Sequence, residues 1–342
     1  MQKPISNEEL TRTIEAYREA DNNASAAAKA LGIPRSTMQS RVRAARAAGL
    51  MTSPNVEFPA FVGGDDDTPI EEILRRKSAD FERTLSAANA KKWFTIRLNE
   101  SKPYGLMLFG DPHIDDNGCN MPLLQRHIEV ARRDGIYSVN IGDTTNNWVG
   151  RLMRLYADQD TSEKTAKRLA EWFMFDSGIT WLCWVLGNHD LWNRGAEFHK
   201  RLGVDHVPVL DWHAQFKIAH PGGYELKVDA AHGRKGNSIW NNIHSTLRAA
   251  KLNEHADLFV TGHTHNYAME DIEIAERGTS AWLVQLRGYK YMDSHALLHG
   301  FAEHQRGSSV LAVVDPRKNA RTRVICFEDV EQGANYLEWL RK

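Results

Sequence analysis

The chain has 342 residues and a mass of 38.8 kDa, and its 42% apolar and 25% charged residues are the balance of an ordinary globular protein, not of a disordered or fibrous one. A net charge of −1 and a pI near 7.0 exclude a basic surface over the whole chain for nucleic acid or an anionic membrane. The length predicts one large domain and a small one.

The cysteines and the N-terminus indicate the compartment. Cys119, Cys183 and Cys326 stand far apart and form no CxxC pair, so we expect neither a disulfide framework nor a thiolate zinc site. The first ten residues lack the basic and then apolar layout of a signal peptide. No apolar run approaches the ~20 residues of a membrane span. We therefore expect a cytoplasmic protein that makes no membrane contact.

Residues 7–50 show the pattern of three short helices, at 7–20, 25–31 and 34–48. Gly32 stands where a C-cap glycine belongs, and Pro34 stands in the first turn of the next helix. This spacing is typical of a helix-turn-helix, which reads DNA through its last helix. The side chains that would contact DNA are Arg35, Ser36, Thr37, Gln39, Ser40, Arg41 and Arg43.

The charge of this N-terminal region is mildly basic, with eight Lys or Arg against five Asp or Glu in residues 1–50. The alternative to a DNA-binding module is a small three-helix module for protein contacts.

Residues 51–68 hold prolines, glycines and an acidic run, the composition of an exposed linker. Residues 69–92 follow with apolar side chains at helical spacing. We therefore expect a domain at 1–50, a linker and flanking helix at 51–92, and a large domain at 93–342.

From residue 93 the pattern changes to short apolar runs that alternate with amphipathic stretches. The predicted strands are 106–109, 136–141, 179–186, 228–231 and 258–261, and the predicted helices are 121–133, 161–175 and 238–253. Beyond residue 266 helices become scarce, and strand-like runs at 281–286, 309–314 and 323–327 suggest sheet edges. This alternation predicts an α/β layered fold with buried sheets.

Each of the first five predicted strands ends in a glycine-marked cluster of polar side chains. The clusters are Gly110-Asp111-Pro112-His113, Gly142-Asp143, Gly187-Asn188-His189-Asp190, His232-Gly233 and Gly262-His263-Thr264-His265. Strand ends of an open α/β sheet meet at one rim, where such sheets hold their ligands. Any one of these clusters alone is more often a turn or an exposed loop. The five in order, each after an apolar run, predict a site.

The residue types in these clusters indicate a metal centre. Carboxylate and imidazole suit Mn²⁺, Fe²⁺ or Zn²⁺. There are too many candidate ligands for one tetrahedral ion, and their number suits two ions ~3.5–4 Å apart. Two such ions would lower the pKa of a bridging water, so that hydroxide is available at neutral pH. His232 is the weakest member, with His220 and His244 as rivals in the same stretch. The seven candidates are Asp111, His113, Asp143, Asn188, His232, His263 and His265.

In this order and spacing, GDPH, GD, GNHD, HG and GHTH resemble the five signature motifs of the calcineurin-like metallophosphoesterase superfamily, over residues 104–266. The resemblance implies a four-layer α/β/β/α sandwich, two divalent ions (Mn²⁺ first, with Fe²⁺, Zn²⁺ or Ni²⁺ as alternatives) and hydrolysis of a phosphoester. It places Asp111, His113 and His265 on the first metal, Asp143 between the metals, and Asn188, His232 and His263 on the second.

The resemblance also implies the proton donor. His189 would stabilise the transition state and protonate the leaving oxygen, and Asp190 would orient its ring. Proton transfer of this kind typically contributes ~10²–10⁴ in rate.

Substrate contacts are expected from residues that metal binding alone does not need. Asn146 or Asn147 resembles the family residue that contacts the substrate phosphate, and Arg151 follows closely; the alternative for the asparagines is ordinary turn chemistry. Further cations could bind phosphate or simply be solvated surface charges. They are Arg194, Arg234, Lys235, Arg287 and Lys290.

A DNA-binding module joined to a phosphoesterase predicts a nuclease or DNA phosphodiesterase, an arrangement that resembles fusions encoded by phages or prophages. One alternative is a phosphodiesterase or phosphatase for a small nucleotide, with the helices in a regulatory role. Another is a DNA-binding regulator with an inactive metal site, which the intact ligand set argues against.

Overall fold

The computed structural model describes residues 5–51, 68–150, 153–155, 159–193, 195–203, 207–275, 278–291 and 306–342. The predicted linker falls almost entirely outside these residues. The chain divides into two compact units, Met1–Arg76 and Lys77–Lys342. None of the described helices is long and apolar enough to span a membrane.

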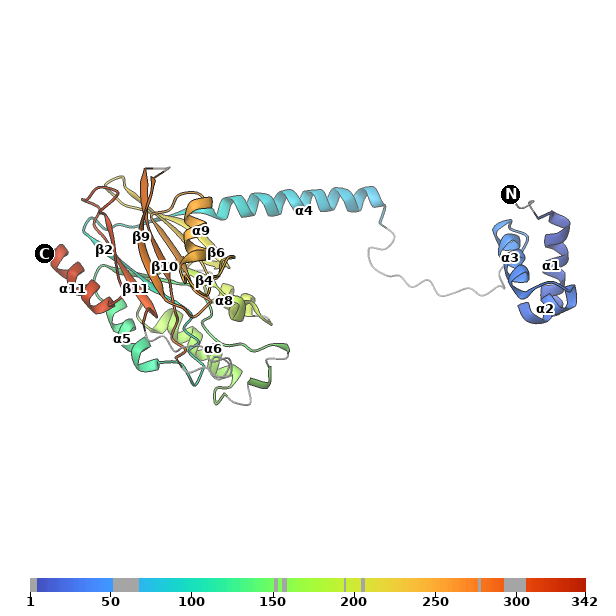
Figure 1. Cartoon of the computed structure of the whole chain (residues 1–342), viewed down its shortest axis with the longest axis horizontal. Helices are drawn as coiled ribbons and strands as arrows, with labels where there is room; N and C mark the ends of the chain where they lie inside the picture. The colour runs from blue at the N-terminus through green and yellow to red at the C-terminus, as the bar shows by residue number, and fades with distance from the viewer. Residues whose placement is uncertain are drawn as a thin grey trace. The chain divides into compact units, whose positions relative to one another are not determined.

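The first unit contains three helices, α1 (Asn7–Glu19), α2 (Ala24–Leu31) and α3 (Arg35–Ala47), which contact one another (Figure 1). A capping box begins α1, where the Ser6 side chain accepts the N–H of Glu9 and the Glu9 carboxylate accepts the N–H of Ser6. Gly32 ends α2 in the left-handed conformation, at φ 63°, as the sequence predicted. Met38 and Ala45 of α3 are fully buried against the other two helices.

Helix α4 (Ile70–Lys91) carries apolar side chains at helical spacing, but none of its residues is buried among the described part of the chain. Its exposed side chains include Phe81, which is 63% exposed. The boundary between the two units falls within this helix.

The second unit is built on two six-stranded mixed sheets. One has the order β12-β11-β2-β3-β4-β5, in which β2, β3, β4 and β5 run parallel and β11 and β12 add antiparallel pairs. The strands are β2 (Tyr104–Phe109), β3 (Ile136–Asn140), β4 (Trp181–Leu186), β5 (Val209–Asp211), β11 (Ser309–Val314) and β12 (Val324–Phe327).

The other sheet has the order β1-β6-β7-β8-β10-β9, with β7, β8 and β10 parallel at its centre. The remaining pairs are β1 with β6, which is parallel, and the antiparallel pairs of β6 with β7 and β9 with β10. The strands are β1 (Lys92–Arg97), β6 (His213–Ala219), β7 (Glu225–Ala231), β8 (Leu258–Thr261), β9 (Ala268–Ile274) and β10 (Thr279–Gln285).

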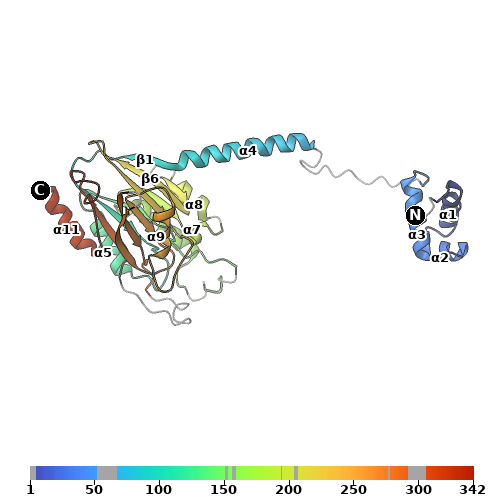
Figure 2. The same cartoon turned by 45° about the horizontal axis from the view of Figure 1, so that its top comes forward.

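The two sheets pack face to face, and helices cover their outer faces, which gives the predicted four layers (Figures 1 and 2). Along β2, Leu106 and Leu108 point into the core between the sheets, whereas Met107 and Phe109 point to the helix side. Because both faces are buried, the central strands are continuous apolar runs. The outer helices are α5 (Met121–Ala131) and α11 (Val330–Arg341) against the first sheet and α9 (His244–Leu252) against the second.

Shorter elements connect these layers. They are α6 (Glu163–Glu171), which continues into the π-helical turn η3 (Trp172–Asp176), and two further helices, α7 (Asn188–Leu191) and α8 (Gly195–Gly203).

The strands β1, β5, β6 and β9 were not predicted from the sequence, and three of the predictions differ from the structure. Residues 238–243 precede α9 and are not helical. Strands β10 and β11 lie inside their sheets and not at the edges. The C-terminal stretch also ends in a helix, α11, where helices were expected to be scarce.

We expect Phe216→Ala to lower the stability of the second unit by about 3–5 kcal/mol, because Phe216 is fully buried between the sheets and its loss leaves a cavity. The matched control is Phe81→Ala on α4, which we expect to change stability by less than about 0.5 kcal/mol. Urea unfolding followed by tryptophan fluorescence measures both. Equal effects of the two substitutions would contradict this packing.

Candidate metal centre

The loops that follow β2, β3, β4, β7 and β8 bring the predicted ligands together from both sheets. Several of these residues have a left-handed backbone, which costs a non-glycine residue roughly 1–3 kcal/mol. They are Asp111 (φ 35°), His113 (φ 41°), Asp143 (φ 51°), His263 (φ 71°) and His265 (φ 51°). The surrounding structure therefore holds these side chains in a conformation that the chain does not adopt by itself.

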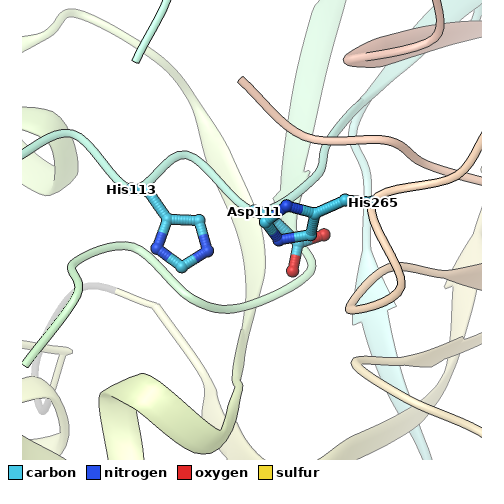
Figure 3. Close-up of side chains that lie close together, drawn as sticks. All are labelled: Asp111, His113 and His265. Carbon is cyan, nitrogen blue, oxygen red and sulfur yellow. The ribbon is translucent and has the colours of Figure 1, made fainter. Parts of the chain in front are cut away.

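Three groups of side chains have ligand atoms within 4.8 Å of one another. Asp111 and His113, on the loop after β2, face His265, on the loop after β8 (Figure 3). The two other groups share one carboxylate. They are His113 with Asp143 and His189, and Asp143 with His232 and His263.

Asp143 is the common member because its Oδ2 atom faces both sides of the site. This atom lies 3.1 Å from Nε2 of His232 on one side and 4.0 Å from Nε2 of His113 and of His189 on the other. Asn188 joins the His232 side, with Oδ1 3.0 Å from Nε2 of His232. Asp143 therefore lies between two sets of candidate ligands, a geometry that fits a candidate dinuclear site.

Hydrogen bonds to the other ring atom orient the two most buried histidines. Nδ1 of His113 lies 2.9 Å from Oδ1 of Asn146, and Nδ1 of His232 lies 2.9 Å from the Ile141 carbonyl oxygen. Such contacts direct Nε2 of a histidine toward a metal. The buried Nε2 of His113 has no hydrogen-bond partner among the described residues. The donor set therefore fits divalent ions.

The glycines of the motifs are needed because backbone and ligands approach closely. A Cβ atom on Gly187 would lie 2.1 Å from Oδ1 of Asp143, and one on Gly262 would lie 2.4 Å from Oδ2 of Asp111. A Cβ on Gly142 would lie 2.6 Å from Nδ1 of His232. These contacts are shorter than van der Waals separation, so any other residue would displace a ligand.

Electrostatics place two of these groups in the form that binds metal. Burial lowers the pKa of His113 well below its ordinary value, and the neighbouring His189 and His265 lower it further, so its imidazole is neutral. Burial opposes ionisation of Asp143, but the surrounding histidines, His232 first, hold its pKa well below its usual range. Neutral imidazole and carboxylate are the metal-binding forms.

The pKa values of two other buried groups, His232 and Asp111, are shifted toward their protonated forms. Burial opposes protonation of His232, but Asp143 and Asp111 raise its pKa to about 10. Burial raises the pKa of Asp111 well above its ordinary value, with His232 opposing the rise and Asp143 adding to it. A bound cation would take the place of the proton shared within this group.

His189 lies in an aromatic enclosure at the edge of the site. Its ring centroid is 5.1 Å from that of Trp148 and 4.2 Å from that of Trp192, and its Nδ1 contacts the Asn146 carbonyl oxygen. Asp190, which we expected to orient this ring, instead accepts the backbone N–H groups of Thr144 and Gly187, both at 2.9 Å. The Asn146 carbonyl therefore orients His189, and Asp190 ties together the loops after β3 and β4.

The two asparagines expected to contact substrate are occupied by contacts within the protein. The fully buried Asn146 amide lies against His113 and donates to Asp116 at 2.7 Å. The Asn147 amide donates to the carbonyl oxygens of His189 and Trp192. Their role in the structure is to position the loops of the site. Arg151 lies outside the described residues.

Most of the other candidate phosphate ligands also have partners. Arg234 donates to the buried Asp229 carboxylate, and Lys290 lies 3.1 Å from Asp116. The guanidinium of Arg287 is buried 3.9 Å from the Tyr291 ring centroid. Lys235 is exposed, and Arg194 lies outside the described residues.

Two polar residues that support the site, Gln159 and His199, were not predicted from the sequence. Gln159 donates to the Asp115 carboxylate at 2.9 Å and accepts from Trp148 and Asn146. Nε2 of His199, on α8, lies 3.6 Å from the Asp190 carboxylate. Neither stands beside a glycine-marked strand end, so the signal that identified the ligands does not apply to them.

The residues predicted to contact DNA lie on α3 in the first unit. Arg35, Ser36, Gln39 and Arg43 are exposed, and Thr37 is half-buried. Arg41 is also half-buried and forms an ion pair with Glu9 at 3.1 Å. The exposed members define the polar face of α3.

Comparison with known proteins assigns no family. No family model and no curated protein matches the chain. Among solved structures, the chain is similar to GAP50, "the anchor in the inner membrane complex of Plasmodium", with 13% identity and a TM-score of 0.32 over 71% of this chain and 96% of that one. A likeness at this level carries no functional assignment.

We expect His232→Ala to lose metal, because it removes a ligand and leaves Asp111 and Asp143 with less opposing charge. The matched control is His244→Ala, since His244 is exposed at the start of α9 and outside the site. Metal content after reconstitution with Mn²⁺ is measured by mass spectrometry. Saturating Mn²⁺ at 100 times its Kd should stabilise the wild type and the control by about 2.7 kcal/mol, and His232→Ala by less. Full metal content in His232→Ala would remove His232 from the ligand set.

Proposed function

We propose that the chain is a dinuclear metal-dependent phosphoesterase of the calcineurin-like type. The observation that carries the proposal is the position of Asp143 Oδ2 between two groups of imidazoles and carboxylates. Asp111, His113 and His265 would hold one ion, Asn188, His232 and His263 the other, and Asp143 both. Mn²⁺ is the first candidate ion, with Fe²⁺, Zn²⁺ or Ni²⁺ as alternatives, since carboxylate and imidazole donors suit this group of divalent ions.

When bound, two ions would supply Lewis-acid activation of the phosphoryl group and a water of lowered pKa. The protein residues supply positioning and proton transfer. Nδ1 of His189 donates to the Asn146 carbonyl, so Nε2, on the side of Asp143, is the atom that can give a proton to the leaving oxygen. The rings of Trp148 and Trp192 limit its movement and its access to water.

We expect His189→Gln to reduce kcat by about 10²–10⁴, because the leaving oxygen then loses its proton donor. Metal content should stay near that of the wild type. The control His244→Gln should change neither quantity. Hydrolysis of a dinucleotide such as thymidylyl-thymidine with Mn²⁺ measures the rate, because its alkoxide leaving group needs a proton. If His189→Gln loses metal instead, His189 is a ligand of the group that it forms with His113 and Asp143.

For the substrate we propose DNA, which makes the protein a nuclease or DNA phosphodiesterase. The support is the exposed polar face of α3, where Arg35 and Arg43 are available for phosphate and Gln39 for a base edge. The second candidate substrate is a small nucleotide. Its support is that both proposed sets of metal ligands lie in the second unit, so that hydrolysis does not need the helices of the first. Comparing turnover of duplex DNA, single-stranded DNA, a cyclic nucleotide and an aryl phosphodiester, with and without residues 1–50, separates the two.

We expect Arg35→Ala and Arg43→Ala to weaken duplex binding and to lower the slope of log K against log salt by about 0.9 each, because each removes one phosphate contact. The matched control is Arg18→Ala on α1, also exposed but outside the polar face of α3. Fluorescence anisotropy over a salt series measures the binding. Equal effects of the three substitutions would indicate a general charge effect and not recognition by α3.

A further inference from the structure

Trp212 is a bulky aromatic residue in a backbone conformation that suits glycine or asparagine. It connects β5 to β6 with φ at 63°, in the left-handed region. A large side chain there is an outlier in folded proteins, and such outliers cluster at functional sites.

The backbone of Trp212 is fixed at the edge of the metal centre. Its N–H donates to the Leu186 carbonyl at 3.0 Å, and its carbonyl accepts the N–H of His232 at 2.9 Å. Leu186 ends the strand that leads to Asn188, and His232 follows the end of β7. Trp212 therefore links the two strand ends that deliver the ligands of one metal.

The side chain of Trp212 is half exposed, whereas its backbone is held by two hydrogen bonds. It is 50% exposed, and its ring centroid lies 6.4 Å from that of His232, with 50° between the ring planes. The two backbone hydrogen bonds need no indole, and Asn or Gly would adopt this φ with less strain. Half of the Trp212 surface is therefore open to solvent beside His232.

We propose that Trp212 is a specificity-determining residue that stacks against a nucleobase of the substrate. This inference rests on the proposed phosphoesterase function. A half-exposed indole beside His232 offers a flat apolar surface at the edge of the proposed metal centre. Stacking on such a surface accepts any base, and truncating such an aromatic residue weakens binding roughly 5- to 150-fold per base. Both a DNA strand and a free nucleotide present this chemistry.

The test compares two substrates that share the scissile bond and the leaving group, thymidine 5′-(p-nitrophenyl phosphate) and methyl p-nitrophenyl phosphate. Trp212→Asn keeps a residue that tolerates the left-handed backbone and removes the ring, whereas Trp212→Phe keeps an aromatic ring. We expect Trp212→Asn to raise KM for the thymidine ester about tenfold, with kcat for both esters and KM for the methyl ester within about twofold of wild type. Trp212→Phe should stay close to wild type.

The matched control is Trp339→Asn, because Trp339 on α11 is also an exposed tryptophan, at 66%. It should change neither ester. If Trp212→Asn impairs both esters equally, the residue only holds the ends of β4 and β7, and the inference is overturned. An unchanged KM for the thymidine ester overturns it as well.

A binding measurement separates this inference from the proposed function. Calorimetric titration with thymidine 5′-monophosphate in Mn²⁺ should show about tenfold weaker binding to Trp212→Asn than to wild type or Trp339→Asn. If the wild type cleaves neither ester but still shows this difference, the proposed hydrolysis fails and the stacking role stands. Equal affinity in all variants overturns the stacking role. The same titration with a single-stranded oligothymidylate compares a DNA strand with the free nucleotide. The source of the base is the ligand that binds the wild type more tightly and loses this affinity in Trp212→Asn.

Discussion

The second unit depends on the burial of two carboxylates, Asp111 and Asp143, where the two sheets meet. An isolated carboxylate in such a place is strongly destabilising, so the surrounding chain must supply opposing charge or hydrogen bonds. Here the compensation comes from both sheets, through the His263 N–H on Asp111 and the His189 N–H on Asp143. Both carboxylates follow strands of the first sheet. The N–H that Asp111 accepts follows a strand of the second sheet, and the N–H that Asp143 accepts follows a strand of the first. The candidate metal centre therefore depends on the same contacts that hold the two sheets together.

The candidate ligands could be predicted because each stands in a glycine-marked motif at the end of an apolar run. The structure shows that Gly142, Gly187 and Gly262 of these motifs have no room for a side chain. The roles of the nearby polar residues could not be predicted in this way. Asn146 has the side chain of a phosphate ligand, but its burial and its contact with His113 make it a support. Only the tertiary structure shows which groups already have partners.

The elements that were not predicted, α11 and β6, differ in how much signal the sequence carries for them. Helix α11 contains Gly333, which lowers helix propensity, and the structure shows why it is there: a Cβ would lie 2.9 Å from the Phe327 side chain. Strand β6 did carry a signal, because Ala214, Phe216 and Ile218 alternate with outward residues. The left-handed Trp212 had no signal, since a tryptophan in a short connection is unremarkable in sequence.

The position of β11 has a consequence for how the protein is made. Its pairing joins Ser309 to Phe109, so β2, the strand that leads to Asp111, is completed by a strand from near the end of the chain. During synthesis β2 has an unpaired edge until β11 has left the ribosome, and contacts of such long sequence separation form slowly. The first sheet therefore cannot be completed in the order in which its strands are synthesised. The unfinished chain exposes an apolar strand edge, and chaperones protect edges of this kind.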